Sequence, residues 1–276
     1  VRTGRYSGHP HQIGVLVRFA PLLALPALLL ACATDPDLPV TPVTPPPPPP
    51  VAARGHWSDS LTWAPGQMPV LGADVTIPVG DTVELDVSPP RLNRLTILGA
   101  LVVAPGKDIQ LTAHEVHVRG TFRIGTEAAP YTRRFTLTLT GAPDGVVTAL
   151  GSKVLAVFPG GTLDIHGEKR LGWTRLATTA PPGATTLSLL EPTNWRIGDR
   201  IVIASTDFDP AEAEEAVVTA ASATSVTLDR ALRNEHWGTV QQVVGRSIDE
   251  RAEVGLLTRN ITVQGDSTST NGFGGH

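Results

Sequence analysis

The chain has 276 residues, with 26 acidic and 22 basic side chains, 27 glycines, 25 prolines and only 5% aromatic residues. This turn-rich composition is typical of a globular β-protein and argues against a helical bundle or a disordered chain. The excess of acidic groups excludes nucleic acid as an expected partner, because a phosphate backbone is bound mainly by clustered Lys and Arg.

Residues 1–32 have the features of a bacterial lipoprotein signal peptide. Three arginines precede an uncharged apolar run over residues 19–31, as in export signals, and the run is too short to cross a bilayer. It ends in Leu-Leu-Ala-Cys, which resembles a lipobox, and Cys32 is the only cysteine. We predict that a lipid on Cys32 attaches the protein to the membrane of the bacterial cell envelope, outside the cytoplasm. The alternative is a non-lipoprotein signal, with Cys32 cut away or inert.

Residues 33–53 form a proline-rich linker. It contains six consecutive prolines, Pro45–Pro50, which favour an extended polyproline helix. We interpret the segment as a stiff tether between the membrane and the folded part. Recognition by a proline-binding domain is the alternative.

A glycine that follows a short β-like run recurs about every 21 residues, at Gly99, Gly120, Gly141 and Gly161. Apolar residues alternate with polar ones in each run, as half-buried strands require. A glycine at the same place in every unit indicates a tight bend. We therefore expect an all-β fold, either a β-solenoid or a sandwich of stacked hairpins.

The second half of the chain continues the β pattern, with one short helix-like stretch over residues 209–216. Its expected strands are 186–189, 200–204, 215–219, 225–228, 240–244 and 260–263.

Residues 54–175 resemble the eight-glycine (G8) domain, a module of extracellular proteins. The matching residues are Trp57, Trp63, Pro65, Gly66, Pro69, Gly72, Val75, Ile77, Gly80, Val83, Leu85, Asp86, Leu95, Ile97, Gly99, Leu101 and Ile124-Gly125-Thr126. The resemblance implies a G8-type β-solenoid or stacked hairpins over this range.

Longer runs are similar to the cell-surface hyaluronidase and hyaluronan-binding proteins that carry this domain. They are residues 163–174, 195–216, 248–266 and 273–276. The resemblance implies that residues 176–276 begin a right-handed parallel β-helix, and the chain then reads as truncated. The α/β domain that vertebrate members insert between the segments of Trp173 and Trp195 is missing here.

Four arginines are candidates for contact with a glycan: Arg91, Arg94, Arg119 and Arg123. They lie in the most basic part of the chain, so a polyanion would have to be held there.

Four carboxylates are candidates for calcium binding: Asp207, Asp209, Glu214 and Glu215. Calcium prefers several oxygen ligands. The cluster lacks the loop spacing of a known calcium site, so the alternative is a solvated acidic face.

No complete catalytic constellation is visible. His236 and His276 are candidates for acid or base chemistry, but neither has a partner that the sequence identifies. The five tryptophans could stack on sugar rings, although core packing is the favoured interpretation, with Trp57 and Trp63 plugging the solenoid end. Arg251 is expected to form a bidentate pair with a carboxylate that locks two rungs together.

Two functions remain open. The first is a carbohydrate-binding envelope protein that holds an extracellular polysaccharide such as a glycosaminoglycan. The resemblance implies that its full-length form is a hyaluronidase-like depolymerase, whereas this portion alone is expected to be inactive. The second is a non-catalytic adhesion or scaffold module.

Overall fold

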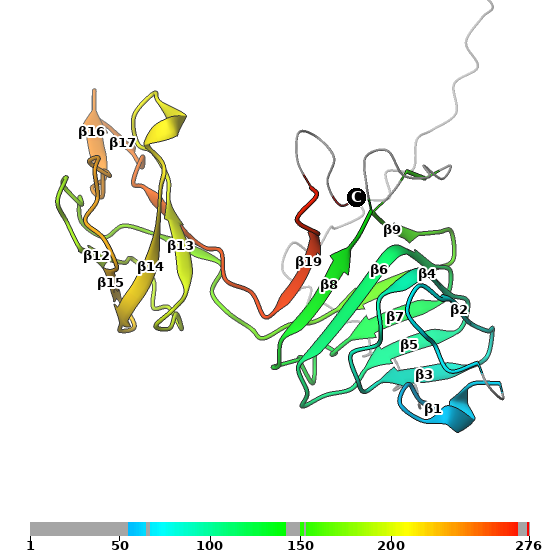
Figure 1. The fold of residues 1–276 in the computed structure, drawn as a ribbon. Coiled ribbons are helices and arrows are strands. Elements are labelled where there is room, and N and C mark those ends of the chain that lie inside the picture. Colours follow the sequence, from blue (N-terminus) through cyan, green and yellow to red (C-terminus); the bar gives the residue numbers. More distant parts are fainter. Residues whose placement is uncertain (1–54, 65–66, 142–149, 152, 270–274, 276) are drawn as a thin grey trace, which may run out of the picture. The chain divides into compact units, whose positions relative to one another are not determined.

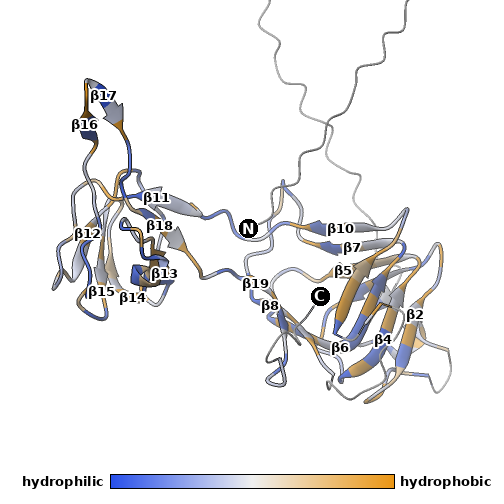
Figure 2. Ribbon diagram, turned by 90° about the horizontal axis from the view of Figure 1, so that it is seen from above, coloured by the Kyte–Doolittle hydropathy of each residue, from blue (hydrophilic) through white to orange (hydrophobic). Residues whose placement is uncertain are grey.

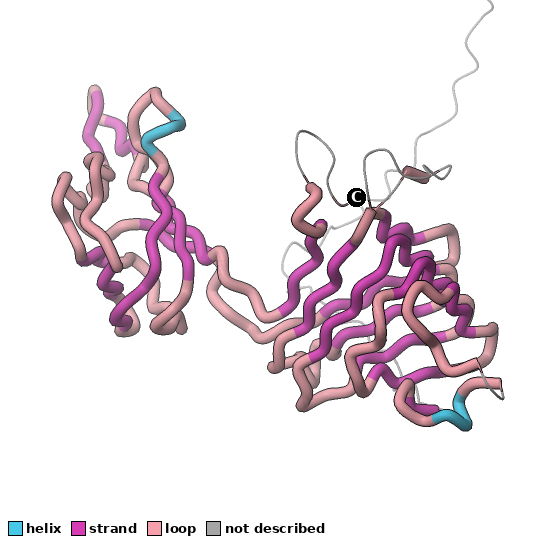
Figure 3. Tube along the Cα trace, in the orientation of Figure 1, coloured by secondary structure: helices cyan, strands magenta, loops and turns pink. Residues whose placement is uncertain are grey.

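A computed structural model of the protein describes residues 55–64, 67–141, 150–151, 153–269 and 275. The predicted signal peptide with Cys32, the linker 33–53 and His276 lie outside these residues. Strands dominate the described residues, and the two helices found there are single 3-10 turns, η1 (Ser60–Thr62) and η2 (Pro210–Glu212) (Figure 3). The predicted all-β class is confirmed. In the described part of the chain, every helix is too short to be a membrane span.

Most of the strands before residue 166 build a parallel solenoid of two sheets (Figure 1). One sheet has the order β1-β3-β5-β7-β10 and the other β19-β8-β6-β4-β2, with β9 also paired to β6. Successive strands mostly alternate between the two sheets, so the chain coils rung upon rung. The solenoid strands are β1 (Gly55–His56), β2 (Asp74–Ile77), β3 (Thr82–Leu85), β4 (Leu92–Ile97), β5 (Ala100–Val103), β6 (Ile109–Val118), β7 (Thr121–Ile124), β8 (Phe135–Leu139), β9 (Val154–Val157), β10 (Thr162–Ile165) and β19 (Ile261–Gly265).

The solenoid core consists of apolar columns that run through successive rungs. Ile77, Ile97 and Val118 lie in register on β2, β4 and β6 and are fully buried. Figure 2 shows hydrophobic residues on solenoid strands such as β5. Each fully buried side chain of this size stabilises the fold by about 1.5–3 kcal/mol, so the stacking of like residues is the main source of stability.

Three of the four periodic glycines form a column at one corner of the solenoid. A Cβ on Gly120 would lie 2.0 Å from the carbonyl oxygen of Gly99, and one on Gly161 would lie 2.3 Å from that of Val118. Close backbone approach therefore requires glycine at these bends. The prediction is wrong for Gly141, which lies near His114 and Lys153 instead.

An interrupted strand explains the misplaced glycine. The long strand β6 pairs with β8 through residues 109–113 and with β9 through residues 115–118. Strands β8 and β9 thus serve one rung, and the segment between them, which contains Gly141, is an insertion in that rung. The 21-residue spacing of the glycines predicts two rungs between Gly120 and Gly161, but the chain forms one rung there.

Residues 173–256 form a separate antiparallel lobe with its own core, which includes Trp195, Ile201 and Val254. The strand order is β11-β18-β13-β14-β15-β12, beside an isolated hairpin β16-β17. The lobe strands are β11 (Trp173–Arg175), β12 (Thr186–Ser188), β13 (Arg200–Ile203), β14 (Glu214–Ala221), β15 (Ser225–Leu228), β16 (Gln241–Val243), β17 (Arg246–Ile248) and β18 (Glu253–Leu256).

The parallel β-helix expected over residues 176–276 is not what most of this region forms. Every strand pair of the lobe is antiparallel, and only β19 joins a parallel sheet, by pairing Ile261 with Phe135 of β8. The helix expected at 209–216 is the single turn η2, after which β14 begins at Glu214. In the order of the chain, the lobe is thus inserted between two solenoid strands.

Three polar contacts hold the returning strand to the solenoid. The amide of Asn260 donates to the carbonyl oxygens of Tyr131 at 2.6 Å and Arg133 at 2.8 Å. The ammonium of Lys153, fully buried, lies 2.8 Å from a carboxylate oxygen of Asp266. Because a buried charge is costly without a partner, the Lys153–Asp266 pair ties the end of β19 to the interrupted rung.

Candidate ligand pocket

An open pocket of about 370 Å³ lies in the antiparallel lobe. Three segments that are distant in the sequence form most of it: residues 206–212 with η2, residues 233–237, and the β16-β17 hairpin with Glu250 just after it. Figure 1 shows the η2 turn and this hairpin at the same end of the lobe. The lining residues are Pro182, Thr206, Asp207, Glu212, Arg233, Asn234, Glu235, Trp237, Gln241 and Glu250.

His236 fixes the segment 233–237 from the interior of the lobe, where it is fully buried. Its Nδ1 lies 2.9 Å from the carbonyl oxygen of Ala204 and its Nε2 lies 3.2 Å from Oε1 of Glu214. A carbonyl oxygen only accepts, so Nδ1 donates to Ala204, and Nε2 is the ring atom that faces Glu214. Both ring nitrogens of His236 are thus engaged inside the lobe.

Glu214 completes this arrangement from the start of β14. Burial opposes ionisation of its carboxyl group, but hydrogen bonds from the backbone N–H groups of Asn234 and Arg233 and from His236 outweigh it and lower the pKa of Glu214. The carboxylate therefore stays charged and holds the start of the segment while His236 holds its end. Glu214 is a structural group beneath the pocket.

Trp237 presents an aromatic surface at the pocket. Its backbone N–H donates to Oγ1 of Thr206 at 3.0 Å, and its indole Nε1–H donates to the carbonyl oxygen of Thr239 at 2.7 Å. The next residue, Gly238, packs so closely on the backbone of Thr178 that a Cβ would lie 2.1 Å from it. These contacts fix the half-buried indole in one position, with part of its surface left for a ligand.

The predicted calcium ligands do not converge. Asp209 caps η2 by accepting from the backbone N–H of Ala211, and Glu215 pairs with Arg200 on the strand surface. Asp207 lines the pocket, whereas Glu214 lies beneath it. Over the described ranges, no group of three His, Cys, Asp or Glu residues is arranged to hold a metal ion.

Of the four predicted glycan-binding arginines, two are neutralised within the solenoid. Nε of Arg94 lies 2.8 Å from Oε2 of Glu115, and Nε of Arg123 lies 2.8 Å from Oδ2 of Asp164. Arg119 lies over the ring of Phe158, 3.7 Å from its centroid.

The fourth, Arg91, is exposed. Its carbonyl oxygen accepts a hydrogen bond from the backbone N–H of Gly72. The four side chains thus have different environments, and Arg119 and Arg91 remain as surface cations.

Other sequence predictions fall into the core or into local pairs. Trp57 and Trp63 pack edge to face, with ring centroids 4.9 Å apart. Arg251 does form a two-pronged pair, but with Asp249, two residues earlier, at 2.8 Å for each contact. The expectation that Arg251 locks two rungs is wrong, because its partner is a sequence neighbour within the lobe.

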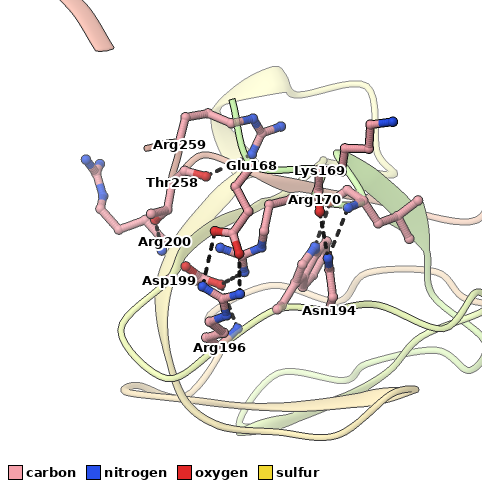
Figure 4. A network of polar contacts seen from close by, with 11 residues as sticks. Glu168, Lys169, Arg170, Asn194, Arg196, Asp199, Arg200, Thr258 and Arg259 are labelled. Carbon is pink, nitrogen blue, oxygen red and sulfur yellow. Dashed lines mark hydrogen bonds and ion pairs between the residues drawn. The ribbon is translucent and has the colours of Figure 1, made fainter. Parts of the chain in front are cut away.

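A polar network fixes the segment through which the chain enters the lobe (Figure 4). Arg170 contacts Asp199 at 2.5 Å, and Arg196 makes a two-pronged contact with Glu168. The amide of Asn194 adds a hydrogen bond to the carbonyl oxygen of Lys169 at 2.9 Å. Both acidic residues of the network, Glu168 and Asp199, are paired with an arginine. The network therefore acts as a structural brace.

The pocket itself was missed by the sequence interpretation. Its central feature, Trp237, is one tryptophan among five, and a lone aromatic residue has no spacing that separates a pocket from a core position. The run Asn234-Glu235-His236-Trp237-Gly238 was the available signal, because polar residues around an aromatic one are common in binding loops.

Comparison with known proteins identifies a G8 domain in this chain. The model of the G8 domain family matches residues 62–177. Human fibrocystin-L is 38% identical over 220 residues, which cover 76% of this chain and 5% of that protein. A G8 domain-containing protein of Dictyostelium discoideum is 29% identical over 239 residues, covering 80% of this chain and 16% of that protein.

Dog fibrocystin is 34% identical over 224 residues, covering 78% of this chain and 5% of that protein. The chain thus spans only a small part of the relatives it matches. Each of these alignments is longer than the 62–177 match, so the similarity extends beyond the solenoid segment. A G8 domain is therefore present at residues 62–177 of this chain.

Proposed function

We propose that this protein is exported, is held at the bacterial cell envelope by a lipid on Cys32, and binds an extracellular polysaccharide through the Trp237 pocket. The observation that supports this proposal is the convergence of an indole with hydrogen-bonding side chains on one open pocket of about 370 Å³. The G8 solenoid serves as the support from which the lobe is displayed.

The pocket chemistry suits a sugar. The apolar face of a pyranose ring stacks on an indole, while its hydroxyl groups need several donors and acceptors nearby. Thr206, Asn234 and Gln241 supply both kinds of group beside Trp237. The volume lies in the range of small-molecule sites, which favours one or two sugar units of a longer chain.

Binding without turnover is the activity that we propose for these residues. His236, the predicted acid or base, is fully buried and engaged at both ring nitrogens, so it does not reach a ligand in the pocket. A hyaluronidase-like activity of a longer protein remains a hypothesis from the resemblance alone.

A non-catalytic scaffold is the second candidate, and one observation favours it. Several charged side chains of the solenoid are paired within the domain, as in the Arg94–Glu115, Arg123–Asp164 and Lys107–Asp86 contacts. Charges that are already paired suit a spacer better than a binding site.

A glycan array probed with the full chain tests the proposal. We expect retention on at least one polysaccharide and loss of at least about tenfold in affinity for Trp237→Ala, as for an aromatic stacking residue at a binding hot spot. Trp173→Ala is the matched control, because Trp173 is 53% exposed on β11 and lies outside the pocket. Retention that survives Trp237→Ala would place the glycan site outside the pocket, and no retention on any glycan would favour the scaffold.

A further inference from the structure

The Trp237 pocket has a strongly negative lining. Four of its residues are acidic, Asp207, Glu212, Glu235 and Glu250, and only Arg233 is basic. Like charges that surround one opening repel one another, and a ligand with the opposite charge relieves that repulsion. The charge of the lining therefore gives information about the ligand.

Two of these carboxylates are not neutralised within the domain. Among the residues that the structure describes, the side chains of Glu212 and Glu235 have no ion pair or hydrogen bond. Glu250 only accepts a hydrogen bond from the neutral amide of Gln241, at 3.3 Å. The solenoid carboxylates Glu115 and Asp164, in contrast, each contact an arginine at 2.8 Å.

A bound metal ion is a poor explanation for this charge. A divalent cation needs several oxygen ligands close together, and no such group of three occurs in the described part of the chain. The carboxylates line the wall of a pocket of about 370 Å³ instead of meeting at one point. Such an arrangement suits a positive charge carried by a larger organic group.

Trp237 provides a second, independent reason to expect a cation. Tryptophan has the most negative aromatic face of the natural side chains and attracts an ammonium group placed over it. The indole Nε1–H donates to Thr239, and the backbone N–H of the same residue donates to Thr206, so the side chain is already held in place to receive a ligand. An indole flanked by carboxylates is a general solution for holding an organic ammonium.

We infer that the Trp237 pocket binds an amino sugar whose amino group is free and protonated, such as a unit of a de-N-acetylated glucosamine polymer. The ammonium group lies against the carboxylates, and the sugar ring stacks on the indole. This inference rests on the proposed function, and it excludes anionic glycosaminoglycans from this pocket. The amide and hydroxyl groups of Asn234, Gln241 and Thr206 favour a polyhydroxylated ligand over a cationic peptide.

Titration calorimetry with the full chain tests the inference directly. Glucosamine oligomers and N-acetylglucosamine oligomers of equal length are compared at about pH 6, where an aliphatic amine is protonated. We expect the glucosamine oligomers to bind at least about tenfold more tightly, as for a hydrogen bond to a charged group. Their affinity is also expected to fall as salt is added, because the carboxylates face water.

Two variants locate the effect. The double change Glu212→Gln with Glu235→Gln removes charge but little volume, and it is expected to abolish most of the preference for the free amine. Glu127→Gln is the matched control, since Glu127 is an exposed acidic residue of the solenoid, outside the pocket. The control protein is expected to bind as the unchanged protein does.

The outcomes separate the inference from the proposed function. Equal binding of both oligomers, unaffected by the double change but lost in Trp237→Ala, overturns the charge argument and leaves the sugar site in place. Binding of neither oligomer, or of lysine oligomers as tightly as glucosamine oligomers, overturns the amino-sugar assignment. If neither oligomer binds and the glycan array also shows no retention, the polysaccharide proposal is wrong as well.

Discussion

The solenoid strands and the pocket loops of the lobe differ in how their charged side chains are partnered. In the solenoid, parallel stacking places residues of successive rungs directly above one another, so Arg94 meets Glu115 and Arg123 meets Asp164 across neighbouring strands. In the lobe, the loops beside η2 and around Trp237 leave carboxylates such as Glu212 facing an open pocket. Regular stacking satisfies side chains internally, whereas irregular loops keep groups available for a ligand.

The sharpest test of the solenoid's side of this comparison is Gly120→Ala. The added Cβ would lie 2.0 Å from the carbonyl oxygen of Gly99 and 2.4 Å from that of Leu98, so two rungs must separate. We expect a loss of about 4 kcal/mol or more in the free energy of unfolding, measured by urea denaturation. Gly80→Ala is the control. Gly80 has a positive φ but open space, and about 1 kcal/mol is expected there. Similar losses would contradict the stacking argument.

A second test removes the buried charge that ties β19 to the solenoid. Lys153→Met leaves Asp266 without its cation, and breaking a buried pair costs about 3–5 kcal/mol. Hydrogen bonds from Lys153, Thr268 and the backbone of Gly141 hold the pKa of Asp266, against the effect of burial, at about 2. A carboxyl group whose pKa is lower in the folded than in the unfolded protein stabilises the fold at pH values above its ordinary pKa, which is 3.8 for Asp266. That contribution is lost as the pH falls toward 2.

Urea unfolding at a series of pH values measures this effect. The unchanged protein is expected to lose stability between about pH 4 and pH 2, and Lys153→Met is expected to lose less over that window. Lys107→Met serves as the control, because Lys107 is exposed and its ammonium lies 4.0 Å from its carboxylate partner, farther than the 2.8 Å of the Lys153–Asp266 pair. An equal acid dependence in all three proteins would show that the Lys153–Asp266 pair is not the source.

Sequence periodicity predicts stacked β-units, with a solenoid as one of two alternatives, because each rung repeats the same physical requirement. The positions of Gly99, Gly120 and Gly161 follow from close backbone approach, which no other residue allows. The insertion between β8 and β9 has no such signature, so Gly141 was placed in the wrong column. The alternation of apolar residues is the same in parallel and antiparallel strands, and it therefore could not reveal that the lobe is antiparallel.

The candidate pocket was less accessible to sequence reasoning. The acidic residues within 207–215 suggest a cluster, but Glu214 and Glu215 point to opposite faces because they are neighbours on β14. His236 was considered for catalysis, yet its burial and its contacts with Ala204 and Glu214 depend on strands that are distant in the sequence. A pocket formed by three separate segments requires the fold to be known first.

A third test concerns the support beneath the pocket. Glu214→Gln removes the charged acceptor for His236 and the backbone of Asn234, with an expected cost of about 2 kcal/mol at neutral pH. Since the pKa of Glu214 is lowered in the folded protein, its contribution is present above the ordinary value and is lost as the pH falls. The two proteins should therefore converge in stability in acid. Glu215→Gln, on the exposed face, is expected to change stability by less than about 1 kcal/mol.

The smallest predicted effect is a gain in stability at the tip of the lobe hairpin. Val244 is almost fully exposed and has a φ of 49°, in a region that a β-branched residue rarely adopts. Val244→Asn creates Asn-Gly before β17, the preferred pair for a two-residue hairpin turn. We expect a gain of about 0.5–1 kcal/mol, read as a higher urea midpoint. Gln241 of the same hairpin lines the pocket. If Val244→Asn raises stability but weakens sugar binding, the strained turn belongs to the binding surface, whereas unchanged binding would confine recognition to the Trp237 segment and η2.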